Sequence, residues 1–233
     1  MQAIVLAGGL GTRLRQVVPD LPKPMAPVAG RPFLAWILDR LVQAGFDRIV
    51  LAVGYRGDVI RDHFGRDYNG VPVAYSTEEE PLGTGGAIRL AAQCITESPV
   101  FVLNGDTFVE VDYGAMWSAH QRIGALMSLA VCRVPDTGRY GAVEIDMGRV
   151  CGFREKGIRR AGAINAGTYL IGREVIDMIP PAQVVSFEQE MLMAKVAAIR
   201  PAAFEACGLF IDIGVPDDYA RAQDLFATRT PRP

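Results

Sequence analysis

Apolar and polar positions in the first half of the chain follow two alternating patterns. Short apolar runs, typical of strands buried on both faces of a parallel sheet, occupy residues 3–7, 48–53, 71–76 and 99–106. Segments with helical apolar spacing lie between them, at residues 33–44, 57–64 and 86–94. This alternation predicts an α/β fold of Rossmann-like type, with a doubly wound, mostly parallel sheet.

The second half of the chain has a different pattern. Its strand-like runs, most of them joined by tight turns rather than helices, are residues 125–134, 141–146, 150–155 and 163–171. Two helical patterns follow, at residues 186–198 and 216–227. We therefore expect a smaller, mixed β part here, within one domain over residues 1–233 whose two halves meet near residue 115.

Composition narrows the function classes. The 233 residues carry 24 Lys+Arg against 26 Asp+Glu, so a general affinity for nucleic acid or an anionic membrane is not expected. No apolar run approaches ~20 residues, and the start lacks a basic signal-peptide region, which favours the cytoplasm. The four cysteines form no C-x-x-C pair, so we expect small buried residues and no thiolate zinc site. His63 and His120 are expected at the surface. The composition leaves the oligomeric state open, with a homo-oligomer as one alternative.

A glycine-rich stretch follows the first apolar run, from Gly8 to Arg13, and Lys23 lies between two prolines. Ligands of open α/β sheets bind outside the carboxyl ends of the strands, and glycines let backbone N–H groups approach phosphate. A tight turn is the simple alternative. The dinucleotide fingerprint of a nicotinamide dehydrogenase fails because Leu14 occupies its third glycine position, and no P-loop occurs.

Polar residues also appear at later points where a buried strand ends or a glycine-rich turn begins. Asp106 ends one strand, and Asp212 lies between apolar residues; both could be metal ligands or ordinary turn residues. The stretch "PLGTGGA" over residues 81–87 could be a binding loop or a helix cap. Glu155 and Lys156 could form a surface ion pair, and Asn165 could be a turn residue.

The string "LAGGLGTRL" followed by "PKPM" resembles the signature of the sugar-1-phosphate nucleotidylyltransferases. Later blocks are similar to those of the family in the same order, namely "EEPLGTGGAI", "LNGD", "YGAVEID", "FREKG", "INAGTYL" and "FIDIGVPDDY". The resemblance covers nearly the whole chain. It implies the fold of nucleotide-diphospho-sugar transferases and transfer of a nucleoside monophosphate from an NTP to a sugar 1-phosphate with Mg²⁺, for cell-surface glycan synthesis.

The variant "RQVVPDLPKPM" is most similar to the subgroup that uses GTP and D-glycero-α-D-manno-heptose 1-phosphate. Enzymes for N-acetylmuramate, mannose or glucose 1-phosphate share the same motifs, and a non-catalytic nucleotide-sugar sensor is a further alternative. Arg139 is long enough to bind the extra hydroxyl of a heptose, although it could equally face solvent. The implied partners are small molecules only.

The resemblance also implies roles for individual residues. Arg13 would contact the pyrophosphate, Lys23 the α-phosphate, and Asp106 with Asp212 the Mg²⁺ ion. The implied nucleotide-binding residues, mostly in the half over residues 1–115, are Leu6, Ala7, Gly8, Gly9, Gly11, Thr12, Arg13, Lys23, Glu80, Gly83, Thr84, Gly85 and Asp106. The implied sugar-phosphate residues, mostly in the half over residues 116–233, are Asn104, Gly105, Tyr140, Gly141, Glu155, Lys156, Asn165 and Gly167. Backbone groups of Gly83–Gly85 would contact the base, Lys156 the sugar phosphate and Glu155 the sugar hydroxyls.

Overall fold

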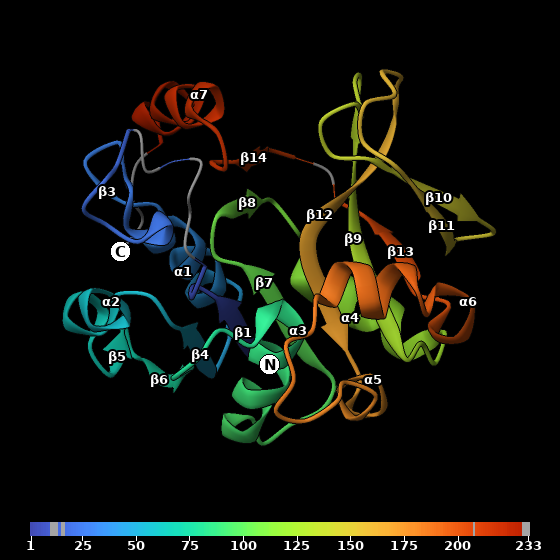
Figure 1. Cartoon of the computed structure of the whole chain (residues 1–233), viewed down its shortest axis with the longest axis horizontal. Helices are drawn as coiled ribbons and strands as arrows, with labels where there is room; N and C mark the ends of the chain where they lie inside the picture. Colours follow the sequence, from blue (N-terminus) through green and yellow to red (C-terminus); the bar gives the residue numbers. More distant parts are fainter. Residues whose placement is uncertain (10–13, 15–16, 207, 230–233) are drawn as a thin grey trace.

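The structure is a computed structural model that describes residues 1–9, 14, 17–206 and 208–229. One ten-stranded sheet runs through both halves of the chain in the order β10-β11-β13-β9-β12-β7-β1-β4-β6-β5 (Figure 1). Four neighbouring strands from the first half of the chain run parallel in it, namely β7 (Val100–Asn104), β1 (Gln2–Leu6), β4 (Arg48–Val53) and β6 (Val71–Thr77). These are the four apolar runs of the first half, and the α/β prediction is confirmed.

Side chains of β1 alternate between two hydrophobic clusters, which explains its unbroken apolar sequence. Ala3 and Val5 belong to one cluster and Ile4 to the other, and all three are fully buried. The first cluster contains side chains of α1 (Phe33–Gln43), α2 (Gly57–Phe64), α4 (Tyr113–Arg122) and α7 (Pro216–Ala227). The second contains side chains of α3 (Gly83–Ala91) and α5 (Arg173–Asp177). The sheet is therefore covered by helices on both faces.

The second half extends the same sheet with strands of mixed direction. Strand β12 (Gly162–Ile171) pairs antiparallel with β7 on one side and with β9 (Met127–Val134) on the other, so it joins the two halves. The strands beyond β9 are β13 (Ala202–Glu205), β11 (Arg149–Arg154) and β10 (Ala142–Asp146). The helix expected at 186–198 is divided into a π-helix, η3 (Phe187–Met193), and α6 (Val196–Ile199).

Short elements complete the fold. A separate two-stranded ribbon pairs β8 (Thr107–Val109) with β14 (Phe210–Asp212). The remaining short elements are η1 (Lys23–Met25), β2 (Pro27–Val28), β3 (Arg31–Pro32), β5 (Asp67–Tyr68) and η2 (Ala92–Cys94).

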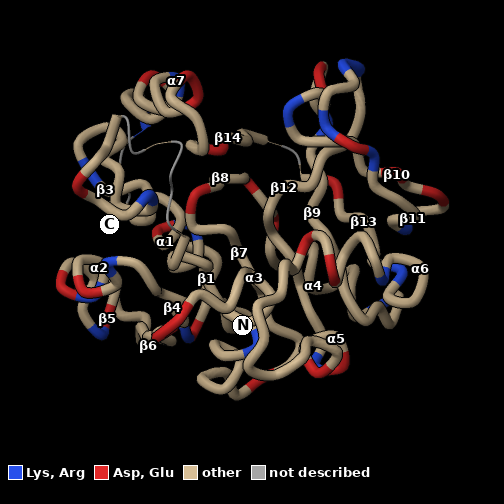
Figure 2. The backbone as a smooth tube through the Cα atoms, viewed as in Figure 1, with Lys and Arg blue, Asp and Glu red and all other residues tan. Residues whose placement is uncertain are grey.

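Two further structural findings concern charge and membrane association. Basic and acidic residues are interspersed along both halves (Figure 2), and none of the described helices combines the length and apolarity that a membrane crossing requires.

Two sequence-based expectations are wrong. His120 is 5% exposed, because α4 packs against β9, where the Nδ1 atom of His120 lies 2.9 Å from Ser128 Oγ. Burial lowers the pKa of this imidazole. Cys151 is exposed although we expected buried cysteines, because it alternates with the buried Val150 along β11. His63 is exposed as expected.

Candidate active site

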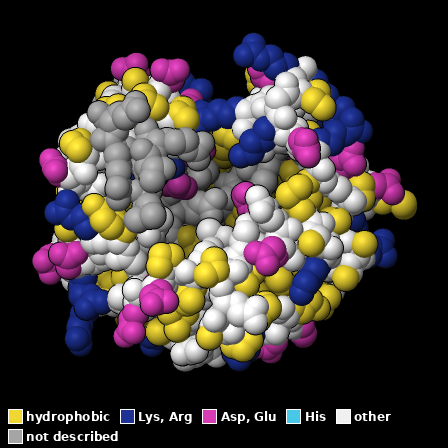
Figure 3. All heavy atoms as spheres, viewed as in Figure 1, with side chains coloured by type: hydrophobic (Ala, Val, Ile, Leu, Met, Phe, Trp, Pro, Cys, Tyr) yellow, Lys and Arg dark blue, Asp and Glu magenta, His cyan; other side chains and the backbone are white. Residues whose placement is uncertain are grey.

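A cavity of about 920 Å³ lies between the two halves of the chain, at the carboxyl ends of the parallel strands. Leu6 at the end of β1, Gly54 after β4 and Asn104 at the end of β7 all line it. The molecular surface is hollowed between the side that carries α7 and the side that carries β10 and β11 (Figure 3). The sheet topology thus gathers residues from distant parts of the sequence around one space.

Asp106 and Asp212 lie side by side in this cavity because β8 and β14 pair in an antiparallel ribbon. Asp212 is in register with Thr107, and the backbone N–H of Ile213 donates to the Asp106 carbonyl oxygen at 3.1 Å. The two carboxylates are partly exposed, at 35% for Asp106 and 26% for Asp212. The ribbon therefore brings together two acids that are 106 positions apart (212 − 106).

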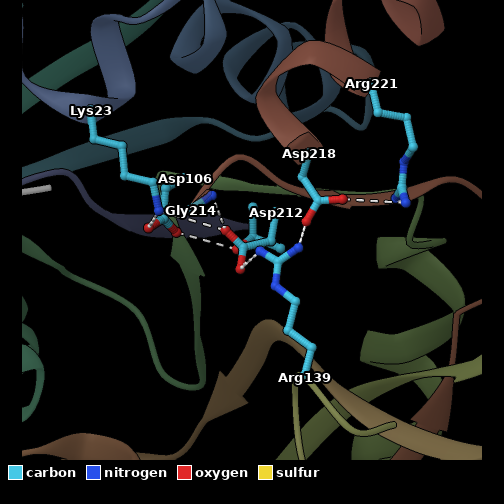
Figure 4. A network of polar contacts seen from close by, with 8 residues as sticks. Lys23, Asp106, Arg139, Asp212, Gly214, Asp218 and Arg221 are labelled. Carbon is cyan, nitrogen blue, oxygen red and sulfur yellow. Dashed lines mark hydrogen bonds and ion pairs between the residues drawn. The ribbon is translucent and has the colours of Figure 1, made fainter. Parts of the chain in front are cut away.

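Lys23 lies between these two carboxylates. It begins the short 3₁₀ turn η1, flanked by Pro22 and Pro24, and its side chain is only 11% exposed. Its ammonium group donates to Asp106 Oδ2 and lies 3.6 Å from Asp212 Oδ1. The three side chains form one cluster in which a cation bridges two anions (Figure 4).

The pair of carboxylates fits a divalent cation of the Mg²⁺ type. Hard oxygen donors already share one positive group here, and Mg²⁺ in nucleotide enzymes needs only one or two carboxylates, with phosphate oxygens and waters completing its shell. Within the described ranges, no group of three or more His, Cys, Asp or Glu side chains could hold a metal. Asp106 and Asp212 are therefore the residues that could bind Mg²⁺ together with a phosphate.

Only some of the residues expected to bind nucleotide line the cavity. Those that line the cavity are Leu6, Gly8, Gly9, Lys23, Gly83, Thr84 and Asp106. Ala7 is buried behind it, where its N–H donates to Ala52 O at 2.8 Å, and Glu80 is exposed and outside the lining. Gly11, Thr12 and Arg13 lie outside the described residues.

The glycines of the second loop contact the protein's own chain. The N–H of Gly85 donates to Val185 O at 2.8 Å, and Thr84 Oγ1 accepts from the N–H of Phe187 at 2.9 Å. A Cβ on Gly83 would lie 2.5 Å from Val185 O, and one on Gly85 would lie 2.8 Å from Val185 Cγ1. We call this contact between residues 82–86 and 183–187 the clasp. The clasp accounts for both glycines, and the Gly85 N–H is already engaged in it.

Likewise, only some of the residues expected to bind the sugar phosphate line the cavity. Asn104, Tyr140, Lys156, Asn165 and Gly167 line the cavity. Gly105 and Gly141 are buried beside it, and Glu155 is exposed and outside the lining. The polar atoms of Asn165 already have protein partners, because Oδ1 accepts from Gly167 N at 2.9 Å and Nδ2 donates to Tyr169 Oη at 2.8 Å.

Three acidic residues that sequence reasoning did not assign to the site also line the cavity, namely Glu78, Glu79 and Glu188. Glu188, at the start of η3, is placed there by the clasp, with Oε1 3.3 Å from Asn165 Nδ2. Desolvation raises the pKa of Glu188, while the charge of Lys156 opposes this shift. Desolvation also raises the pKa of Glu78, whose Oε2 accepts from Leu82 N at 2.7 Å. No motif or periodicity in the sequence identifies Glu78 or Glu188, whereas Glu79 is the first residue of the block "EEPLGTGGAI".

Arg139 does not extend into the cavity, and it is not among the described residues that line it. Its guanidinium forms ion pairs with Asp212 and with Asp218 in the first turn of α7 (Figure 4). It also lies over the ring of Tyr140, 5.0 Å from the ring centroid. Neither expectation for Arg139, a free sugar-binding donor or a solvent-facing side chain, describes this arrangement.

Comparison with known proteins places this geometry in a family. Residues 2–229 match the family model described as "Nucleotidyl transferase". The D-glycero-alpha-D-manno-heptose 1-phosphate guanylyltransferase of Aneurinibacillus thermoaerophilus is 42% identical over 223 residues, covering 96% of this chain and 97% of the relative. Its counterpart from Campylobacter jejuni is 40% identical, covering 94% and 97%.

A solved structure supports the same relationship. The crystal structure of HddC from Yersinia pseudotuberculosis complexed with GMP-PN has a TM-score of 0.85 and 38% identity, and the match covers 97% of this chain and 99% of that one. The inositol-1-phosphate CTP transferase from T. maritima, at 22% identity and a TM-score of 0.79 with 98% of this chain and 97% of that one covered, shares the fold. The family match, the near-complete coverage by relatives and the shared fold agree, and the chain belongs to the nucleotidyl transferase family.

Proposed function

We propose that this chain is a Mg²⁺-dependent guanylyltransferase that transfers GMP from GTP to D-glycero-α-D-manno-heptose 1-phosphate and releases pyrophosphate. The observation that carries the reaction class is the cation-bridged pair of carboxylates, Asp106 and Asp212, in a cavity lined by both halves of the chain. The choice of substrates is supported by two relatives that carry the name of this activity and match over nearly their whole length.

Charge neutralisation is the main demand of this reaction. GTP and a sugar 1-phosphate together carry about six negative charges, whereas the chain has a formal net charge of −2. Phosphoryl transfer requires little covalent chemistry from the protein, so positioning and local cations dominate the rate. Lys23 and Lys156, which both line the cavity, are suited to this task.

Each residue then has one part in an in-line displacement. A phosphate oxygen of the sugar 1-phosphate forms a new bond to the α-phosphorus of GTP, while the bond from that phosphorus to the pyrophosphate oxygen breaks. Lys23 stabilises the charge that develops on the α-phosphate, and Lys156 binds the sugar phosphate. When bound by Asp106 and Asp212, Mg²⁺ supplies further neutralisation of the α-phosphate. The electron pair leaves with pyrophosphate, and no covalent enzyme intermediate forms.

Arg13 lies outside the described residues, and its assignment to the leaving pyrophosphate rests on the motif alone. On the sugar side, we assign contacts with the heptose hydroxyls to Tyr140 and Glu188, which both line the cavity. We assign the reaction to the cytoplasm, where GTP is available, and the product to cell-surface glycan synthesis.

A substrate panel tests this proposal. The purified protein is incubated with Mg²⁺ and each of GTP, UTP, dTTP and CTP, combined with the 1-phosphates of heptose, mannose, glucose and N-acetylmuramate. Mass spectrometry identifies the nucleotide sugar, and pyrophosphate release gives the rate. GDP-heptose as the main product supports the proposal. Another nucleotide sugar as the main product refutes the substrate assignment, and no nucleotide sugar from any pair refutes the reaction class.

A further inference from the structure

We propose that Arg139, held by the buried carboxylate of Asp218, positions Asp212 for metal binding without contacting the substrates. The inference rests on the proposed function, because it takes Asp212 as a metal ligand. It goes beyond that function by assigning a positioning role to two residues outside the cavity lining.

The geometry of the guanidinium is the first support. Arg139 lies on the connection between β9 and β10, in the second half of the chain, and it reaches toward β14 and α7 (Figure 4). Its Nη2 lies 3.4 Å from Asp212 Oδ2, and its Nη1 forms an ion pair with Asp218 Oδ2. Because the guanidinium is planar and rigid, fixing one nitrogen on Asp218 also fixes the nitrogen that faces Asp212.

Asp218 has a physical reason to hold Arg139 tightly. Its side chain is 9% exposed, and a buried carboxylate is strongly unfavourable unless it is paired. Oδ2 of Asp218 forms its ion pair with Nη1 of Arg139. The other oxygen, Oδ1, lies 3.3 Å from Nη1 of Arg221, a side chain that is 53% exposed.

The two oxygens of Asp212 are held from opposite sides. Oδ1 accepts from the N–H of Gly214 at 2.7 Å and faces Lys23 at 3.6 Å, while Oδ2 faces Arg139. Loss of Arg139 would leave the Oδ2 side without this partner, so the carboxylate could rotate about its terminal bond. Partners that orient a metal-binding carboxylate typically affect metal affinity or activity by about 10–100-fold.

The backbone around Arg139 is itself fixed, so the guanidinium starts from a defined position. The N–H of Gly157 donates to Gly138 O at 2.6 Å, which ties this loop to the loop that carries Lys156. The ring of Tyr140 packs edge-on against Phe210 of β14, with centroids 5.4 Å apart. The loop is therefore attached both to the sugar side of the cavity and to the strand that ends in Asp212.

Metal binding without substrate tests the proposal directly. Mn²⁺ serves as the probe, and its affinity for the protein alone is measured by water-proton relaxation. Arg139→Gln and Asp218→Asn are each expected to weaken Mn²⁺ binding by about tenfold or more. Because both changes remove the same ion pair, the double variant should lose no more Mn²⁺ affinity than the single variant with the larger loss. GTP binding in EDTA should stay unchanged in both. Arg221→Ala is the matched control, because it removes the exposed partner of Asp218, and it should bind Mn²⁺ like wild type.

Two results would overturn the proposal. One is a Mn²⁺ affinity of Arg139→Gln within twofold of wild type. The other is a loss of turnover in Arg139→Gln with wild-type turnover in Asp218→Asn, which would make Arg139 a direct substrate ligand. If Asp218→Asn does not fold, the Mn²⁺ affinity of Arg139→Gln decides alone. Because this assay uses no substrate, a wild-type protein that makes no GDP-heptose would refute the proposed function and leave the test of Arg139 valid.

Discussion

Replacing Gly85 by Ala should strain the clasp that joins the two halves beside the cavity. The new Cβ would lie 2.8 Å from Val185 Cγ1 and 3.1 Å from Val185 O. The Gly85 N–H donates to that oxygen at 2.8 Å, so the segment cannot retreat freely without weakening this hydrogen bond. We expect residues 185–188 to shift, and Glu188 to move with them.

The magnitude follows from the packing. Overpacking a closely packed contact costs about 1–3 kcal/mol, and the higher helix propensity of Ala offsets up to about 1 kcal/mol of this loss. Val185 is 2% exposed, so Val185→Ala should cost about 1.6 kcal/mol for two buried methyl groups. Since Val185→Ala also removes the atom that clashes, the double variant should be more stable than the sum of the single effects predicts, by about 1 kcal/mol.

Denaturant unfolding of wild type, the two single variants and the double variant measures this coupling energy. The helix propensity of Ala at position 85 cancels from the coupling energy, because it contributes equally with and without Val185. Steady-state kinetics supply a second result. The KM for the sugar phosphate should rise in Gly85→Ala and fall back toward wild type in the double variant. Effects on stability that add within about 0.3 kcal/mol would refute the tight contact. A rise confined to the KM for GTP would favour base binding by Gly85 instead.

Three further predictions concern the cluster and the core. Lys23→Ala and, from its motif, Arg13→Ala should each lower kcat by about 10²–10³ in a folded protein, and near-wild-type turnover would remove their phosphate roles. Asp106→Asn and Asp212→Asn should abolish turnover because Asn keeps the shape but not the charge; full activity in EDTA would exclude the metal assignment. Burial lowers the pKa of His120 below its usual value of 6.5. As the pH falls below 6.5, the unfolded chain therefore binds a proton at His120 before the folded protein does, and wild type loses stability. His120→Gln should show a smaller fall in Tm from pH 7 to pH 5, and equal falls would contradict the burial argument.

The sequence was sufficient to predict the parallel strands of the first half and the edge at which the cavity forms. Buried parallel strands produce unbroken apolar runs, and the ligands of such sheets bind at the carboxyl ends of the strands. The strand order, which makes β1 and β7 neighbours, and the joining of both halves in one sheet could not be read from these runs. The family resemblance pointed to Lys23, Asp106 and Asp212 as site residues, because each of them lies in a short, distinctive string.

The clasp and the Arg139 network could not be predicted in the same way. Phe187 and Thr84 are 103 positions apart, and nothing in their local pattern indicates that they are hydrogen-bonded. Glu188 lies in a helical segment whose amphipathic pattern indicates burial on one face but not the element that it contacts. The partners of Arg139 depend on where α7 begins relative to β14, which is a property of the assembled fold.

The central claim is that the chain transfers GMP to a heptose 1-phosphate, and one comparison of specificity constants tests it most directly. Values of kcat/KM are measured with GTP and Mg²⁺ for D-glycero-α-D-manno-heptose 1-phosphate and for mannose 1-phosphate, which lacks one carbinol group. A site built to bind the extra hydroxyl should favour the heptose by about tenfold or more. Equal constants for the two sugars, or a higher constant for mannose 1-phosphate, would contradict the account.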